Sequence, residues 1–443
     1  MTPLKVGKLQ QALHVKAKEE PEFRFYQLYD KIYRWDVLVH AYRSCRANAG
    51  AAGVDGLTFD KIEAKGVKQW LEELAVDLRK KIYSADPVRR VWIAKANGKL
   101  RPLGIPTVRD RVVQSAVVLV LEPIFEADLQ PEQYAYRRRG TPPDRSAQDA
   151  VKHVHRLVGN GYNEVVDADL SGYFDSIPHA ALMRSVARRV SDRSLLSLIK
   201  QWLVAPVEED DGSGGKGRTS RAKHEKRGVP QGAPISPLLA NLYMRRFLLG
   251  WKALGYQQGL QAYIVNFADD FVICCRGNAA AAMQVMRQMM ARLDLTVNED
   301  KTCLRHLPEE SFDFLGYTIG RCYSRRTGRA YIGTRPSKKS IQRTSARISA
   351  LTARRMTLLE ADEVVKQLNR LLLGWSNYFC LGPVSKAYRV LDAHSRHRLR
   401  QWLRAKHKIK GQGTSRYPNE YLDDVLGLVR LSLRTRDFPW AKT

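Results

Sequence analysis

Two adjacent carboxylates, Asp269 and Asp270, interrupt the apolar stretch that runs from Asn266 to Ile273. Charged groups inside a hydrophobic segment are costly unless an opposite charge offsets them, and a metal ion is the usual partner. A third carboxylate, Asp169, stands 100 residues upstream of Asp269, at the end of another apolar, strand-like run. Three carboxylates that converge on hard divalent cations are what a two-metal phosphoryl-transfer site requires. The pattern therefore predicts that Asp169, Asp269 and Asp270 are catalytic and hold two Mg²⁺ ions, for which Mn²⁺ could substitute.

The same three residues also have ordinary structural explanations. Asp is a common helix cap, so Asp169 could begin the segment that follows its strand. Asp is also a frequent turn residue, so Asp269 and Asp270 could simply form a hairpin turn. The apolar runs on both sides of the pair, together with the upstream strand-end carboxylate, favour the metal site. Strand alternation puts Asp167 on the same face as Asp169, and Asp175 begins a new segment.

The charge of the chain favours a polyanionic partner. Its 443 residues carry a formal net charge of +29 and a pI near 10.0, which predicts salt-sensitive binding to nucleic acid. Residues 321–443 hold 27 Lys and Arg against 8 Asp and Glu, so most of the excess lies in this segment. A chain of this length has room for two or three domains with proper cores.

The sequence predicts neither a membrane protein nor a secreted one. The longest apolar run, Ala116–Leu121, is far too short to span a bilayer, and residues 1–20 lack the continuous apolar segment of a signal peptide. The six Cys show no C-x-x-C spacing, so reduced thiols are expected. We therefore expect a cytoplasmic protein of bacterial type, with association with the nucleoid as an extension of that expectation and no membrane partner. The oligomeric state is not predicted.

Hydrophobic periodicity and turn residues divide the chain into helices and strands. Helices are predicted over residues 24–48, 67–82, 110–125, 147–158, 234–254 and 279–293. Strands are predicted over 89–93, 99–105, 164–170, 262–275 (a strand–turn–strand) and 312–319. Residues 208–226 are acidic, then Gly-rich, then basic, with almost nothing apolar, and are predicted to form a mobile surface loop. Beyond residue 335 the pattern becomes helical and basic.

Five sequence blocks occur in an order that resembles a known family. They are Lys95–Pro106 (KANGKLRPLGIP), Asp169–Phe174 (DLSGYF), Gly228–Asn241 (GVPQGAPISPLLAN), Phe267–Asp270 (FADD) and Phe314–Gly316 (FLG). One such block is a weak signal, but five in this order are specific. Over roughly residues 24–410 the chain resembles a group II intron reverse transcriptase, also called an intron maturase. Leu368–Phe379 is similar to the maturase, or thumb, block of that family.

The resemblance implies an α+β right-hand polymerase fold with a C-terminal helical thumb, or maturase, domain. The corresponding division is an N-terminal tail (1–23), reverse transcriptase fingers and palm (24–320), a helical RNA-binding domain (335–410) and a C-terminal tail (411–443). The implied activity is RNA-directed DNA synthesis with Mg²⁺, on an RNA template, from a DNA primer or target and dNTPs. Binding of structured intron RNA, with assistance to splicing and mobility, is implied as well.

The resemblance also assigns the groups that would meet the incoming nucleotide. The metal ions would be held by the three carboxylates and by the carbonyl of Leu170. Lys95 and Arg101 would bind the triphosphate, where cations neutralise charge that develops on the leaving phosphates. The simpler interpretation of Lys95 and Arg101 is a pair of exposed charges on a hairpin.

Four further residues receive roles in the same way. Phe174 would collide with a ribose 2′-hydroxyl and so select deoxynucleotides, although core packing is the commoner role of a Phe. Gln231 and Gly232 would lie against the nascent base pair and primer strand, although they could also form a simple turn. Lys301 would stand near the active site, although a single Lys is more often a surface charge.

Two features depart from the family pattern, and three alternatives stay open. Tyr134–Ala147 is longer than the family's Gly-Phe-Arg-type motif, so no template contact is assigned to it. The sequence has no paired Cys after the thumb block, so the zinc-bearing nuclease of some members is not expected.

The alternatives are an RNA-binding splicing factor with a vestigial polymerase, a free-standing group II-like reverse transcriptase in defence or repair, and an RNA-dependent RNA polymerase. The intact carboxylates argue against the first alternative, and Phe174 argues against the third.

Overall fold

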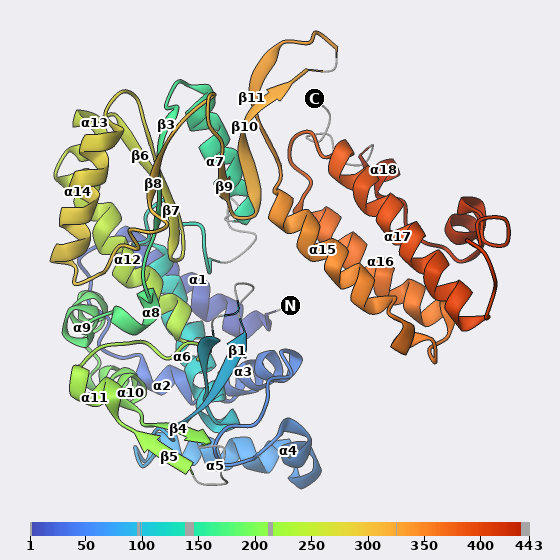
Figure 1. Cartoon of the computed structure of the whole chain (residues 1–443). Helices are drawn as coiled ribbons and strands as arrows, with labels where there is room; N and C mark the ends of the chain where they lie inside the picture. Colours follow the sequence, from blue (N-terminus) through green and yellow to red (C-terminus); the bar gives the residue numbers. More distant parts are fainter. Residues whose placement is uncertain are drawn as a thin grey trace.

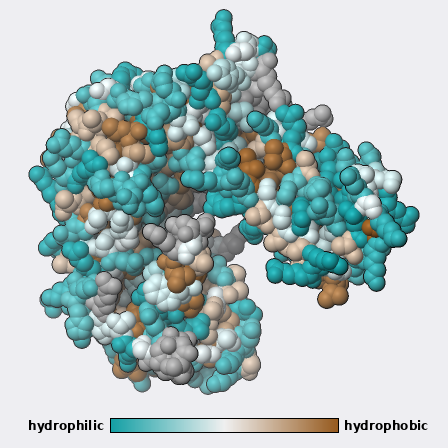
Figure 2. Space-filling view, viewed as in Figure 1, coloured by the Kyte–Doolittle hydropathy of each residue, from teal (hydrophilic) through white to brown (hydrophobic). Residues whose placement is uncertain are grey.

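The computed structural model describes residues 2–94, 98, 100–137, 146–210, 216–324 and 326–435. Helices and two four-stranded sheets form one side of the molecule, and a layer of long helices forms the other (Figure 1). A three-stranded sheet joins the two sides. The surface is hollowed between them (Figure 2). This arrangement confirms the expected α+β polymerase fold with a C-terminal helical domain.

The central, or palm, sheet carries the predicted acidic residues. Its strand order is β6-β7-β3-β8, and all three pairings are antiparallel. The strands are β6 (Ala262–Phe267), β7 (Asp270–Cys275), β3 (Glu164–Asp169) and β8 (Cys303–His306). Three of the four strands therefore come from the segments that the sequence predicts to be extended around the acidic residues.

The two faces of the palm sheet belong to two different hydrophobic cores. Val166, Phe271 and Ile273 pack with α12 (Ser236–Ala253) and α14 (Ala279–Arg292). The alternate residues, which include Val165, Val272 and Cys274, pack with α7 (Ala147–Gly159), in a core that continues through β9 (Phe312–Phe314) and β10 (Tyr317–Tyr323) to the C-terminal helices. Successive strand residues point to opposite faces, so a continuous apolar run is what a sheet covered on both sides needs.

The finger sheet has the order β2-β1-β4-β5. Its strands are β1 (Val88–Ala94), β2 (Leu100–Ile105), β4 (Val207–Asp210) and β5 (Lys216–Thr219). The prediction of a mobile loop over 208–226 is wrong for its described residues, because β4 pairs with β1 and with β5, and α11 (Arg221–Glu225) follows. Glu208 stands opposite Arg218 in this pairing. Opposite charges across two strands stabilise a pairing that needs no apolar side chains.

Short helices surround these sheets. The fingers contain α1 (Leu4–Glu19), α2 (Tyr29–Ile32), α3 (Trp35–Ala47), α4 (Phe59–Lys65), α5 (Val67–Arg79) and α6 (Val108–Glu126). Around the palm lie α8 (Tyr173–Ser176), α9 (His179–Ala187), α10 (Arg193–Val204) and α13 (Tyr256–Gly259). The single helix expected over residues 24–48 is in fact two helices, α2 and α3. Residues 4–19 form a helix whose Val6 and Gln10 are buried, and the Gln10 side chain donates to the Leu119 carbonyl of α6 (2.8 Å).

The C-terminal part begins with the sheet β11-β10-β9, formed by β9 (Phe312–Phe314), β10 (Tyr317–Tyr323) and β11 (Ala330–Pro336). It continues as α15 (Lys338–Leu351), the 3₁₀ turn Arg354–Met356, α16 (Ala361–Tyr378) and α17 (Ser385–Lys406). A π-helical turn (Tyr421–Val425) and α18 (Leu431–Arg434) then fold back onto these helices. The Asp392 carboxylate of α17 accepts hydrogen bonds from the backbone N–H groups of Leu431 and Ser432.

No helix in the described part of the chain is both long and apolar enough to cross a membrane.

Candidate active site

The palm sheet brings the three predicted carboxylates to one end of neighbouring strands. Asp169, the last residue of β3, stands directly opposite Asp270, the first residue of β7. Asp269 lies in the two-residue turn that joins β6 to β7, and its side chain is exposed. Residues opposite each other on antiparallel strands have Cα atoms about 4.5–5.5 Å apart. The backbone therefore supplies a site at which several carboxylates meet.

The turn that presents Asp269 has an unusual backbone. Ala268 adopts a φ of 60°, in the left-handed region that L-residues rarely visit. The buried Asn266 side chain donates a hydrogen bond to the Ala268 carbonyl (2.8 Å) and so holds this conformation. Asn266 therefore positions Asp269, although its polar side chain carries no such signal in the sequence.

Asp270 lies in a strongly acidic environment. Its pKa is raised from 3.8 to about 7, first because the carboxyl group is buried and then because Asp167, Asp269 and Asp169 are close. A hydrogen bond with the backbone of Leu315 lowers this pKa and so opposes the other effects. Burial likewise raises the pKa of Asp167 to about 6. Crowding of this kind disfavours the charged form unless a cation offsets it.

Asp169 has positive and polar partners instead. Its Oδ2 accepts hydrogen bonds from Lys301 Nζ (2.9 Å) and Asn298 Nδ2 (3.0 Å). Its backbone carbonyl also accepts the Asn298 N–H (2.8 Å), and its own N–H donates to the Thr302 hydroxyl. Leu170 follows in a one-residue bridge with Val297, so its carbonyl belongs to the same end of the sheet. Lys301 is therefore at the site, as predicted, whereas the role of Asn298 was not foreseen.

The side chains as placed do not form a closed metal cluster. Across the described residues, no group of three or more His, Cys, Asp or Glu side chains is arranged to hold one ion. The Asp169 carboxylate contacts Lys301, whose ammonium group supplies the local positive charge. The chemistry of the donors nevertheless fits Mg²⁺, because hard cations prefer carboxylate and carbonyl oxygens.

A second group of predicted residues lies between the palm and the finger sheet. Arg101 of β2 donates from Nε to Gln231 Oε1 (2.8 Å), and Gln231 Nε2 donates to Asp175 Oδ2 (3.2 Å). Gly232 has a φ of 108°, and a Cβ at this position would lie 2.6 Å from the Gly104 carbonyl oxygen. Only glycine permits this approach of two backbones. The Gln231-Gly232 segment thus fixes the guanidinium group of Arg101.

Phe174 lies in the wall of a cavity of about 610 Å³ that Arg101, Gln231 and Gly232 also line. Its side chain is only 6% exposed, and its carbonyl accepts the Val229 N–H (2.7 Å). Phe174 therefore contributes to the core and to the cavity wall at once. Lys95, the other residue expected to bind the triphosphate, lies outside the described residues.

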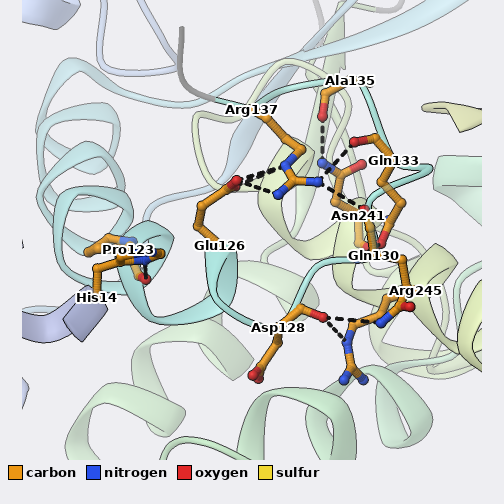
Figure 3. Close-up of polar contacts among 10 residues, drawn as sticks. All are labelled: His14, Pro123, Glu126, Asp128, Gln130, Gln133, Ala135, Arg137, Asn241 and Arg245. Atoms are coloured by element: carbon orange, nitrogen blue, oxygen red, sulfur yellow. Dashed lines mark hydrogen bonds and ion pairs between the residues drawn. The ribbon is translucent and has the colours of Figure 1, made fainter. Parts of the chain in front are cut away.

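Tyr136 also lines this cavity, although the sequence assigned it no role. Its backbone has a φ of 56°, and burial and then Asp269 raise the pKa of its hydroxyl, against the effect of Arg101. The residues on either side are clamped (Figure 3). The Asn241 side chain donates to the Ala135 carbonyl (2.7 Å), and Arg137 forms a buried ion pair with Glu126. This network holds Tyr136 at the edge of the site.

Comparison with known proteins identifies the family to which this site belongs. Residues 93–319 match the family described as reverse transcriptase (RNA-dependent DNA polymerase). Residues 341–419 match the maturase-specific domain of group II introns. The chain belongs to the reverse transcriptases. Its two matched regions make it a reverse transcriptase of the group II intron type.

Individual relatives agree with this assignment. Protein YkfC of Escherichia coli K12 is 31% identical over 76% of this chain and 93% of its own length. Group II intron-encoded protein LtrA of Lactococcus lactis is 27% identical over 67% of this chain. The chain spans 57% of the length of LtrA and 38% of a putative COX1/OXI3 intron 1 protein of Saccharomyces cerevisiae, with which it is 24% identical.

Proposed function

We propose that this reverse transcriptase extends a DNA primer on an RNA template by a two-metal mechanism at Asp169, Asp269 and Asp270. The observation that carries the proposal is the strand register that sets Asp169 opposite Asp270, with Asp269 in the adjoining turn. In this proposal the three carboxylates and the Leu170 carbonyl hold two Mg²⁺ ions. Such ions would supply the positive charge that lowers the pKa of the primer 3′-hydroxyl and stabilises the leaving pyrophosphate.

The other residues of the site bind and orient the nucleotide in this proposal. Arg101, together with Lys95, binds the triphosphate, and Gln231 keeps the Arg101 guanidinium group in place through its 2.8 Å hydrogen bond. Gly232 lets the finger and palm backbones approach closely enough to enclose the nascent base pair. Lys301 pairs with the Asp169 carboxylate and adds positive charge beside it.

Primer extension on an RNA template tests the catalytic assignment. Asp269→Ala is the informative variant, because the Asp269 side chain is exposed in a turn and its removal disturbs little packing. Asp300→Ala removes an equally exposed carboxylate nearby and is the matched control. We expect Asp269→Ala to lose extension and Asp300→Ala to retain it. Equal extension by the wild-type chain and Asp269→Ala would refute the assignment.

Phe174 supports selection of deoxynucleotides in the same proposal, because its ring lies in the wall of the cavity beside Gly232. Phe174→Ala is therefore expected to incorporate ribonucleotides more readily. The measurement is extension with rNTPs alone, compared with dNTPs alone, for both chains. A variant that gains no ribonucleotide incorporation would show that Phe174 serves only as core packing.

We further propose that the chain binds structured intron RNA and assists its splicing and mobility. The support is the match of residues 341–419 to the maturase-specific domain and the similarity to an intron-encoded protein. Folding of an RNA does not require metal-bound carboxylates, so Asp269→Ala should keep its effect on splicing. Loss of splicing along with polymerisation would contradict this separation of roles. A cytoplasmic location is part of the same proposal.

A further inference from the structure

A pocket lined by arginines lies on the side of the palm away from the C-terminal helices. A cavity of about 420 Å³ is surrounded by Arg184 of α9, by Arg188, which directly follows α9, and by Arg245 and Arg246 of α12. In Figure 1, α9 lies on the opposite side of the palm from α15, α16 and α17. We call this cavity the arginine pocket. It shares no lining residue with the cavity that contains Arg101 and Phe174.

The positive charge of the pocket is only partly neutralised by the described residues around it. Asp128 is the one acidic residue in its lining, and the Asp128 carboxylate lies 3.3 Å from Nε of the buried Arg189 behind it. Arg245 donates from Nε to the backbone carbonyl of Asp128 (2.7 Å), as Figure 3 shows. That carbonyl carries no net charge. Arg188 has a more distant acidic neighbour, Glu22 at 3.7 Å, which is largely exposed.

The crowding has a cost that an anion would remove. Burial lowers the pKa of Arg245, and Arg188 and Arg189 lower it further, against the opposing effect of Asp128. Arg188 follows the last residue of α9 and lies four positions after Arg184, a spacing at which like charges repel each other. Arginine stays protonated in proteins, so this pocket cannot relieve repulsion by releasing a proton. Water screens the exposed Arg184 and Arg188 in part, and a bound anion would offset the repulsion directly.

The geometry of guanidinium groups points to phosphate. Each planar guanidinium presents several N–H donors in a fork that matches phosphate oxygens. The basic surface also continues past the pocket, because the exposed Arg24 is tied to the end of α9 by a hydrogen bond to the Ala187 carbonyl (3.1 Å). A stripe of cations suits successive phosphates of a polymer better than one free anion.

We propose that the arginine pocket binds backbone phosphates of structured RNA, at a place separate from the cleft that holds primer and template. The proposal rests on the proposed function, in which the chain holds intron RNA and copies a template. Two separate surfaces would let the protein keep one RNA bound while the cleft is occupied. The same chain could then remain on its RNA partner throughout DNA synthesis.

The test measures the affinity for a structured RNA with the cleft already filled. Wild-type protein and Arg184→Gln/Arg246→Gln are titrated with labelled RNA over a range of salt concentrations, in the presence of a saturating DNA–RNA primer–template hybrid. The control is Arg287→Gln/Arg292→Gln, which removes two exposed arginines from α14. For the pocket variant only, we expect RNA binding to be about tenfold weaker. The slope of log affinity against log salt concentration should also be less steep for this variant, by the equivalent of about one to two phosphate contacts. Thermal unfolding verifies that both variants fold.

Three results would overturn the proposal. Equal affinity and equal salt dependence for the wild-type chain and the pocket variant would show that the pocket does not contact RNA. Displacement of the RNA by the primer–template hybrid would place its contacts in the cleft. Inorganic phosphate could raise the melting temperature of the wild-type chain but not of the pocket variant, while both bind RNA equally well. That result would make the pocket a site for a small anion. Failure of the proposed function is a different result, because the wild-type chain itself would then neither extend a primer nor bind the RNA.

Discussion

The acidic end of the palm sheet and the arginine pocket both gather like charges, but they deal with the repulsion in different ways. At the acidic end, a proton relieves it, and the pKa of Asp270 is raised to about 7. In the pocket, four guanidinium groups remain charged around one cavity. The acidic end should therefore respond to pH and divalent cations, whereas the pocket should respond to salt and polyanions. The two regions predict separable behaviour in one chain.

The largest expected effect is on catalysis. Asp270→Asn keeps the shape of the side chain but removes a negative charge where metal-bound oxygens are proposed. We expect primer extension to fall by about 10³-fold or more, which is comparable to the loss of a main electrostatic contact with the transition state. RNA affinity, measured on the same preparation, should be unchanged. A parallel loss of RNA binding would show that the two regions are not separable.

Salt should act on RNA binding much more than on the acidic end. Between about 50 and 200 mM salt, we expect the affinity of the wild-type chain for structured RNA to fall by at least about 100-fold, because several phosphates are released together. The half-saturating Mg²⁺ concentration for stabilisation of the chain, measured by thermal unfolding, should change far less. Salt-insensitive RNA affinity would contradict the account of phosphate contacts.

A smaller effect is expected at Lys301. Its ammonium group lies 2.9 Å from the Asp169 carboxylate, where it competes with any cation for that carboxylate. Lys301→Met should therefore lower the Mg²⁺ concentration that gives half-maximal stabilisation by about two- to fivefold, the size of an exposed ion pair. Arg287→Met, which removes the pairing of Arg287 with Glu299, is the control. Weaker Mg²⁺ binding by Lys301→Met would mean that Lys301 supports the cation site rather than competing with it.

The smallest expected effect is on stability as a function of pH. Because the pKa of Asp270 is near 3.8 in the unfolded chain and about 7 in the folded chain, the unfolded chain loses this proton first as pH rises. When a chelator removes divalent cations, the contribution of Asp270 to the free energy of unfolding therefore falls between about pH 4 and pH 7. This contribution is lowest above pH 7. At pH 8 the melting temperature of Asp270→Asn should exceed that of the wild-type chain by about 2 °C or more. An equal or lower value would show that Asp270 is not destabilising when charged. Asp300→Asn should change little.

The position of the acidic end of the palm sheet was predictable because local sequence controls it. A strand that ends at Asp169 and a turn at Asp269 place the carboxylates, and alternation and turn residues are visible in a sequence. The positions of Arg101, Gln231 and Gly232 followed from the order of the motifs. These two kinds of signal led to most of the residues in the proposed site.

The remaining residues depend on contacts between distant segments. Asn298 binds Asp169 from 129 positions away, and Tyr136 faces Asp269 because a buried Arg137–Glu126 ion pair anchors its loop. For the described residues of 208–226, the loop prediction was wrong because a charged segment resembles an exposed loop in sequence until the edge of a sheet provides partners for it. The arginine pocket combines α9 and α12, and neither helix indicates such a site alone.

The double-sided palm sheet limits how far this enzyme can be shortened. Val165, Val272 and Cys274 are fully buried, in a core that α7 shares with Phe312 and Phe314 of β9 and that extends to the C-terminal helices. A chain truncated after β8 would lose the part of this core that lies beyond β8. Apolar side chains of α7 and the palm sheet would then meet water and favour aggregation. A shortened polymerase made from this protein would have to retain those C-terminal segments, or carry polar replacements for the apolar residues of α7 and the palm sheet that they cover.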